Sequence, residues 1–89
     1  MVNFQYVERN KMSSEEHTAL HAFINEFWVF MKDFWQVDDT DKYWDTVMDK
    51  ANLIASRYED AGPDVAALTR KLLVTYLNEL DIRNRKARK

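Results

Sequence analysis

Two histidines, His17 and His21, are the side chains of this sequence best suited to binding a metal ion. Their spacing of four places both imidazoles on one face of an α-helix, within reach of a single zinc ion. A zinc site needs three or four ligands, and the chain has no other histidine and no cysteine. A third ligand would have to be an acid such as Glu16, and Thr18 stands where a metalloprotease helix carries its glutamate. We therefore predict no metal site and expect both histidines at the surface or at the rim of the core.

The acidic run at 38–41, Asp-Asp-Thr-Asp, offers the oxygen ligands that calcium prefers. Counted from Asp39, a calcium-binding loop requires glycine at its sixth position and glutamate at its twelfth. Those positions hold Trp44 and Lys50. We interpret the run as the cap of a helix, with Asp39 or Thr40 as the capping residue.

For catalysis the sequence offers no recognisable motif. It contains no nucleophile elbow, P-loop or dinucleotide-binding fingerprint. Carboxylates are plentiful, but only Glu79 falls inside an apolar helical arc, where an ion pair to Arg83 on the next turn is the expected role. We predict that the protein is not an enzyme and has no cofactor or small-molecule substrate.

The strongest functional lead is the aromatic segment 20–35, which holds four of the five Phe and two of the three Trp residues. On a helix its apolar residues cover an arc of roughly 160°. Tryptophan is enriched at binding hot spots, and two interpretations are open: a third helix buries both tryptophans, or they form a docking edge. The residues on the trailing edge of the arc are His17, His21, Ile24, Trp28 and Trp35.

The N-terminal residues 1–12 are a second candidate for contact with a partner. Val2, Phe4 and Tyr6 alternate with polar residues, as in a short extended arm, whereas the spacing of Phe4 and Val7 equally suits a helical turn. A lone strand has no hydrogen-bonding partner. The arm is therefore expected to cross the bundle or to pair with the same arm of a second chain through Phe4 and Tyr6.

The C-terminus is basic, while the rest of the chain is acidic. The last seven residues hold five of the thirteen Lys and Arg residues, and the other 82 hold eight basic against fifteen acidic residues. This tail either contacts nucleic acid through phosphates or is a frayed helix end whose charges suit the helix dipole. In a variant of the first idea, the acidic body mimics nucleic acid and inhibits a basic partner. The nucleic-acid candidates are Arg83, Arg85, Lys86, Arg88 and Lys89.

Three amphipathic segments must position these residues. Ser13 and Glu16 form a capping box at the start of the first helix, and Gly62-Pro63 separates the second helix from the third. The chain has no other Gly or Pro, which disfavours long loops and an all-β architecture. We predict a single all-α domain, residues 1–89, folded as a three-helix up-down-up bundle with a short extended or irregular N-terminal arm. The expected boundaries are 1–12 for the arm, 14–36, 40–61 and 63–84 for the helices, and 85–89 for the basic tail.

No targeting segment is expected. Residues 1–10 contain no apolar core of a signal peptide, and the longest apolar run, 27–31, is five residues against the roughly 20 of a spanning helix. The polar face of the most apolar helix carries Glu15, Glu26 and Asp33, which argues against an anionic membrane surface. We therefore expect a soluble cytoplasmic protein: a small helical protein-interaction or structural module that associates with itself as a homodimer.

Overall fold

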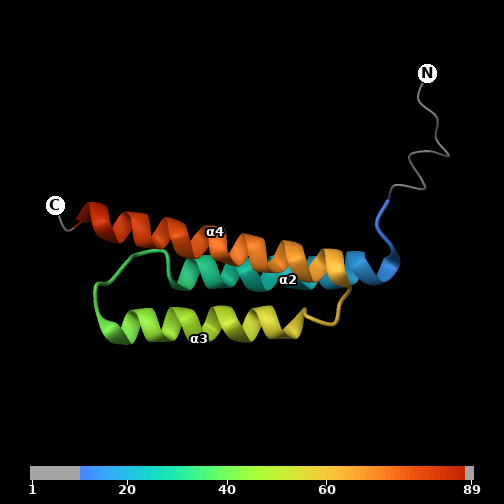
Figure 1. Ribbon diagram of the computed structural model, residues 1–89, viewed down its shortest axis with the longest axis horizontal. Helices are drawn as coiled ribbons and strands as arrows, with labels where there is room; N and C mark the ends of the chain where they lie inside the picture. The colour runs from blue at the N-terminus through green and yellow to red at the C-terminus, as the bar shows by residue number, and fades with distance from the viewer. Residues whose placement is uncertain (1–10, 88–89) are drawn as a thin grey trace, which may run out of the picture.

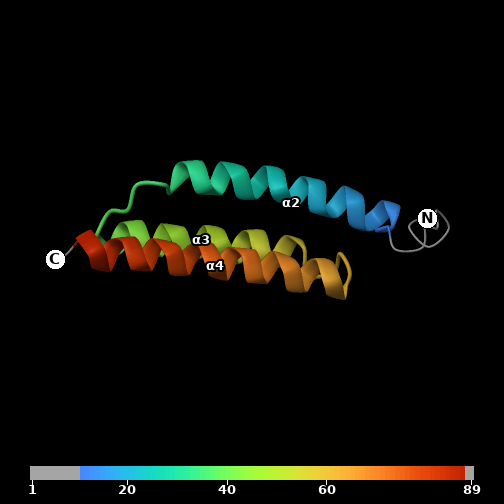
Figure 2. The ribbon, with the colours of Figure 1, turned by 90° about the horizontal axis from the view of Figure 1, so that it is seen from above.

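The structure is a computed structural model and describes residues 11–87. These residues form three α-helices that pack against one another, labelled here as in Figure 1: α2 (Ser14–Asp33), α3 (Asp41–Arg57) and α4 (Pro63–Ala87). In Figures 1 and 2 the chain reverses direction after α2 and again after α3, so that α4 runs the same way as α2. The predicted all-α, three-helix bundle is confirmed.

Each helix begins where local chemistry supplies a cap. The Ser13 hydroxyl accepts a hydrogen bond from the Glu16 backbone N–H at 3.1 Å, and the Glu16 carboxylate accepts one from the Ser13 N–H at 2.9 Å. At α3 the capping residue is Thr40, whose hydroxyl accepts from the Tyr43 N–H at 3.2 Å. Gly62, with φ of 113°, turns the chain into α4. The Ser13 and Thr40 side chains satisfy N–H groups that would otherwise have no partner at a helix start.

The helix ends differ from the predicted ones by three or four residues. The first helix ends at Asp33 rather than at 36, and the second at Arg57 rather than at 61. The third continues to Ala87 instead of stopping at 84, so residues 85–87 belong to a helix and not to a tail. Ion pairs one turn apart, Arg83–Glu79 at 2.8 Å and Arg85–Asp81 at 2.9 Å, support these last turns of α4.

The core lies between the three helices, along the length of the bundle, and is rich in aromatic rings. Phe30 and Tyr76 lie edge to face with ring centroids 5.7 Å apart, and Phe23 and Tyr58 lie in the same way at 5.6 Å, the geometry that aromatic pairs favour. Ala51 on α3 is small and buried, which leaves room for these rings. The central buried cluster consists of Phe23, Phe30, Val47, Ala51, Ile54, Tyr58, Leu73, Tyr76 and Leu80.

Polar contacts on one flank of α2 help to fix how this helix is rotated about its own axis. Glu26 lies on that flank, and its carboxylate forms an ion pair with Arg57 and accepts a hydrogen bond from the Tyr58 hydroxyl. Both partners come from the end of α3. The side of α2 that carries Glu26 is therefore held against α3, and the opposite side is directed away from it.

The connection between α2 and α3 is tied to α4 by a buried amide. Asn84, which is almost fully buried, donates a hydrogen bond from Nδ2 to the Asp39 carboxylate at 3.2 Å.

No helix among residues 11–87 combines the length and the apolar character that crossing a bilayer takes.

Candidate functional site

The aromatic flank of α2 is exposed. Trp28 is 58% exposed, Trp35 50% and Ile24 50%. Burial of both tryptophans by the third helix, the first of the two interpretations above, is therefore wrong. The reason is the placement of α4, whose Tyr76 packs edge-on against Phe27 and Phe30 at 6.1 and 5.7 Å and so covers the neighbouring stripe of α2 instead.

A hollow of about 370 Å³ lies on this flank, lined by Trp28, Met31, Lys32 and Trp35. The Lys32 ammonium lies 5.7 Å from the centre of the Trp28 ring, a cation–π distance. Met31 and Lys32 were not among the residues predicted for the site. We call the set His17, His21, Ile24, Trp28, Met31 and Trp35 the tryptophan edge.

The spacing along the tryptophan edge alternates strictly between four and three residues. This is the heptad spacing of a coiled-coil seam, in which two positions in every seven face a partner helix. Met31 fits the same spacing, three residues after Trp28 and four before Trp35. This spacing is the signal in the sequence from which Met31 could have been assigned to the edge.

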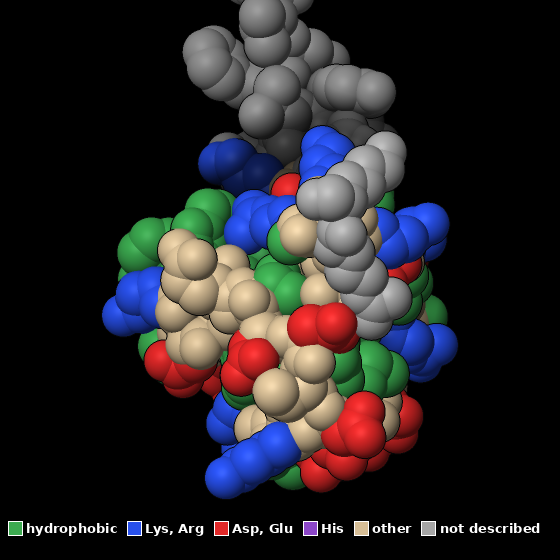
Figure 3. All heavy atoms as spheres, turned by 90° about the vertical axis from the view of Figure 1, so that its left-hand side faces the viewer, with side chains coloured by type: hydrophobic (Ala, Val, Ile, Leu, Met, Phe, Trp, Pro, Cys, Tyr) green, Lys and Arg blue, Asp and Glu red, His purple; other side chains and the backbone are tan. Residues whose placement is uncertain are grey.

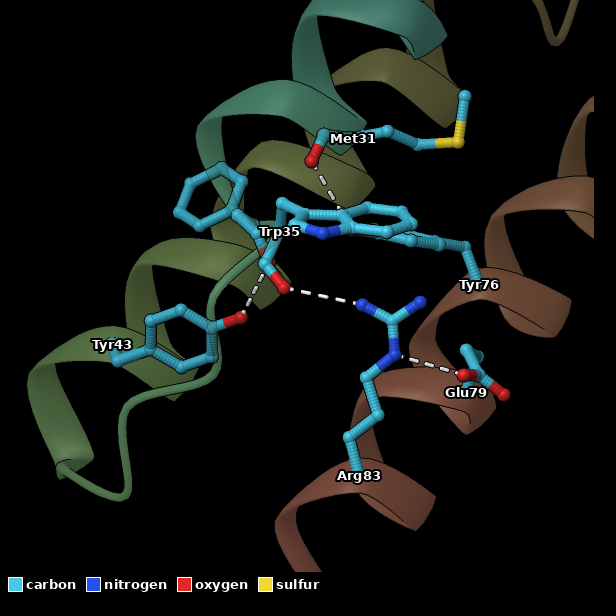
Figure 4. Close-up of polar contacts among 7 residues, drawn as sticks. Met31, Trp35, Tyr43, Tyr76, Glu79 and Arg83 are labelled. Atoms are coloured by element: carbon cyan, nitrogen blue, oxygen red, sulfur yellow. Dashed lines mark hydrogen bonds and ion pairs between the residues drawn. The ribbon is translucent and has the colours of Figure 1, made fainter.

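Trp35 belongs to the connection that follows α2 rather than to the helix itself, since Phe34 is already the C-cap. The Arg83 guanidinium fixes this tryptophan from α4: it lies 4.1 Å from the centre of the indole, and its Nη1 donates to the Trp35 carbonyl at 3.2 Å. Arg83 Nε donates to Glu79 at 2.8 Å, which orients the guanidinium in turn. In Figure 4 the indole lies between the Met31 side chain and the Arg83 guanidinium.

Two tyrosines hold the C-terminal end of α2. The Tyr43 hydroxyl of α3 donates to the Phe34 carbonyl at 2.8 Å, and the Tyr76 hydroxyl of α4 donates to the Met31 carbonyl at 3.2 Å (Figure 4). The last carbonyls of a helix have no partner within it, so these donors take that role. Burial raises the pKa of Tyr43 and of Tyr76 above the usual range, and each phenol keeps the proton that it donates.

The histidines lie at the other end of the tryptophan edge, and both are exposed, as expected. Their rings stack nearly parallel, with centroids 6.2 Å apart and an angle of 7° between the planes. No group of three or more His, Asp or Glu side chains among residues 11–87 is arranged to hold a metal ion. The structure thus places His17 and His21 on the same face as Ile24 and Trp28 and gives them no further ligand there.

The basic residues predicted to contact nucleic acid are not equally available. Arg83 is engaged by Trp35 and Glu79, and Arg85 pairs with Asp81. Lys86 is exposed on the last turn of α4. Arg88 and Lys89, like the N-terminal candidates Phe4 and Tyr6, lie outside the described residues, so nucleic-acid binding by the tail and pairing through the arm stay predictions.

Figure 3 looks along the bundle from the end at which α2 finishes and α3 begins. Hydrophobic side chains reach the surface at the sides of the bundle, and acidic and basic side chains are interspersed around them.

Comparison of the chain with protein-family models, with curated proteins and with solved structures finds no match.

Proposed function

We propose that this protein is a small interaction module that associates with a second copy of itself through the tryptophan edge of α2. One observation carries the proposal: Trp28 and Trp35 are half-exposed and flank a hollow that is already formed. Holding two large rings in water is unfavourable, whereas tryptophans clustered around a pocket are typical of binding hot spots.

The exposed ring surface is large enough to anchor an interface. At up to roughly 250 Å² per Trp side chain, the exposed fractions of Trp28 and Trp35 leave about 270 Å² of ring surface. That is about a third of the roughly 800 Å² that each partner buries in a standard interface. Ile24 and Leu68 add to it, since Leu68 of α4 is 43% exposed and, at about 100° per residue, lies on the same side of that helix as Arg83.

A second copy is the partner that the tryptophan edge fits best. Its five positions on α2, from His17 to Met31, have heptad spacing, which suits pairing with a second helix of the same spacing, and a second copy supplies one. None of its six positions carries Asp, Glu, Lys or Arg, so pairing two such edges buries no fixed charge, which would be costly. Lys32 and Glu79 lie beside the edge, as the polar residues that surround a hot spot do.

The test is a comparison of molecular mass across concentrations. Sedimentation equilibrium of the full chain is expected to show a monomer–dimer equilibrium, and Trp28→Ala is expected to weaken it by about 30-fold, the effect of a hot-spot residue worth about 2 kcal/mol. Leu53→Ala is the matched control, because Leu53 is 47% exposed but belongs to α3. A monomer at the highest soluble concentration, or a dimer that both variants weaken equally, would overturn the proposal.

A further inference from the structure

We infer that the two copies pair α2 against α2 in antiparallel orientation, with the two-fold axis at the height of residue 26 but on the side of α2 opposite to the Glu26 side chain. This inference rests on the proposed self-association and adds its geometry. The two faces are then identical, as a two-fold interface requires, and each copy presents to the other the five positions of the tryptophan edge that lie on α2, followed by Trp35 in the connection.

The sizes of the side chains favour this register. An antiparallel seam pairs positions that lie equally far from the two-fold axis on its two sides. Trp28 then meets the second copy's Ile24, and Trp35, just beyond the end of α2, lies toward the second copy's His17. Met31 meets its His21, so that each bulky side chain opposes a smaller one, the alternation that dense cores use. A parallel seam in register would instead stack Trp28 on Trp28 and Trp35 on Trp35.

The helix dipoles favour the same orientation. Antiparallel pairing opposes the dipoles of the two α2 helices, which is favourable, whereas parallel pairing would align them. Parallel pairing would also place the two acidic first turns, with Glu15 and Glu16, side by side. The last turn does not distinguish the two orientations by its charge, since it holds both Lys32 and Asp33.

Cysteine crosslinking tests the geometry, because the natural chain contains no cysteine. Thr18 and Lys32 are exposed and flank the tryptophan edge without belonging to it. Fourteen residues separate them, about 21 Å along the helix. In the antiparallel register Thr18 of one copy lies beside Lys32 of the other, whereas two copies of Thr18 lie far beyond the roughly 7 Å between Cα atoms that a disulfide spans.

The experiment mixes full-length Thr18→Cys with full-length Lys32→Cys, one carrying a mass label, and treats them with a short bismaleimide crosslinker. We expect a covalent heterodimer from the mixture and only background product from either variant alone. Ser56→Cys, exposed on α3, sets the background for random collision.

Sedimentation of the same samples separates the two proposals. Self-crosslinking of Thr18→Cys above the Ser56→Cys background would overturn the antiparallel orientation. A dimer by mass that yields no heterodimer crosslink would overturn pairing of α2 against α2 while leaving self-association in place. A monomer by mass would overturn the proposed function and, with it, this inference.

Discussion

Thr69 lies on the buried side of α4, 1% exposed, and its hydroxyl has no hydrogen-bond partner within residues 11–87. A buried hydroxyl without a partner is destabilising by about 1–3 kcal/mol. Valine has nearly the same shape and a similar helix propensity. We expect Thr69→Val to raise the free energy of unfolding by about 1 kcal/mol, measured as an increase in the urea midpoint at unchanged slope.

Thr69→Ser is the control for that change, because it keeps the hydroxyl and removes a buried methyl group. It should lower the free energy of unfolding by about 1 kcal/mol. A valine variant less stable than the natural protein would mean that the hydroxyl has a partner in solution.

Arg83 shows how far single residues could be predicted. Its ion pair with Glu79, one turn away on the same helix, was expected and is found. Its contact with Trp35 could not be predicted from the sequence. The two residues are 48 positions apart and meet only because the connection after α2 turns toward α4. The nucleic-acid hypothesis assigned Arg83 to a free tail, and the structure instead makes it the support of the tryptophan edge.

At the scale of the elements, helix starts were predictable and helix ends were not. Ser13, Thr40 and Gly62-Pro63 act on residues next to them, so the sequence alone reveals them. The end of α2 depends instead on Tyr43, which reaches back from α3 to the Phe34 carbonyl. The exposure of the tryptophan edge could not be predicted for the same reason. The sequence shows how wide the apolar arc of α2 is, but not which part of that arc α4 covers.

The buried tyrosines predict a stability that depends on pH. Burial raises the pKa of Tyr43, Tyr58 and Tyr76 above the value near 10 that tyrosine has in an unfolded chain. The folded state then holds these protons more tightly than the unfolded state. Their contribution to stability is complete below about pH 10 and is lost as the pH rises through the raised pKa values.

We expect the free energy of unfolding of the natural protein to fall above about pH 10. The double variant Tyr43→Phe/Tyr76→Phe should fall less steeply there. At neutral pH this variant should be less stable by about 1–3 kcal/mol, because two carbonyls lose their donors. Urea denaturation at a series of pH values measures both effects. Equal slopes for the two proteins would show that the phenols titrate alike in the folded and unfolded chains.

At the scale of the whole molecule, the all-α bundle could be predicted from three apolar arcs, whereas the proposed self-association involves surface that the bundle leaves uncovered. If two copies associate as proposed, their association stabilises the folded chain by mass action. Above the dissociation constant, a tenfold increase in concentration adds about 0.7 kcal/mol per chain, or ~3–6 °C in Tm. We expect this shift in thermal unfolding followed by circular dichroism, and expect Trp28→Ala to move its onset to concentrations about 30-fold higher. A concentration-independent Tm for the natural protein would contradict dimerisation.

The hydrogen bonds at the C-terminal end of α2 have a consequence for any attempt to compete with this protein. Tyr43, Tyr76 and Arg83 all bond carbonyls in or just after the last turn of α2, and all three come from other helices. A synthetic peptide of residues 14–36 lacks those donors, and nothing in it holds the second indole in place. Such a peptide carries every residue of the tryptophan edge, yet we expect it to be a poor inhibitor of the proposed association, because the shape of the edge forms only when the whole chain has folded.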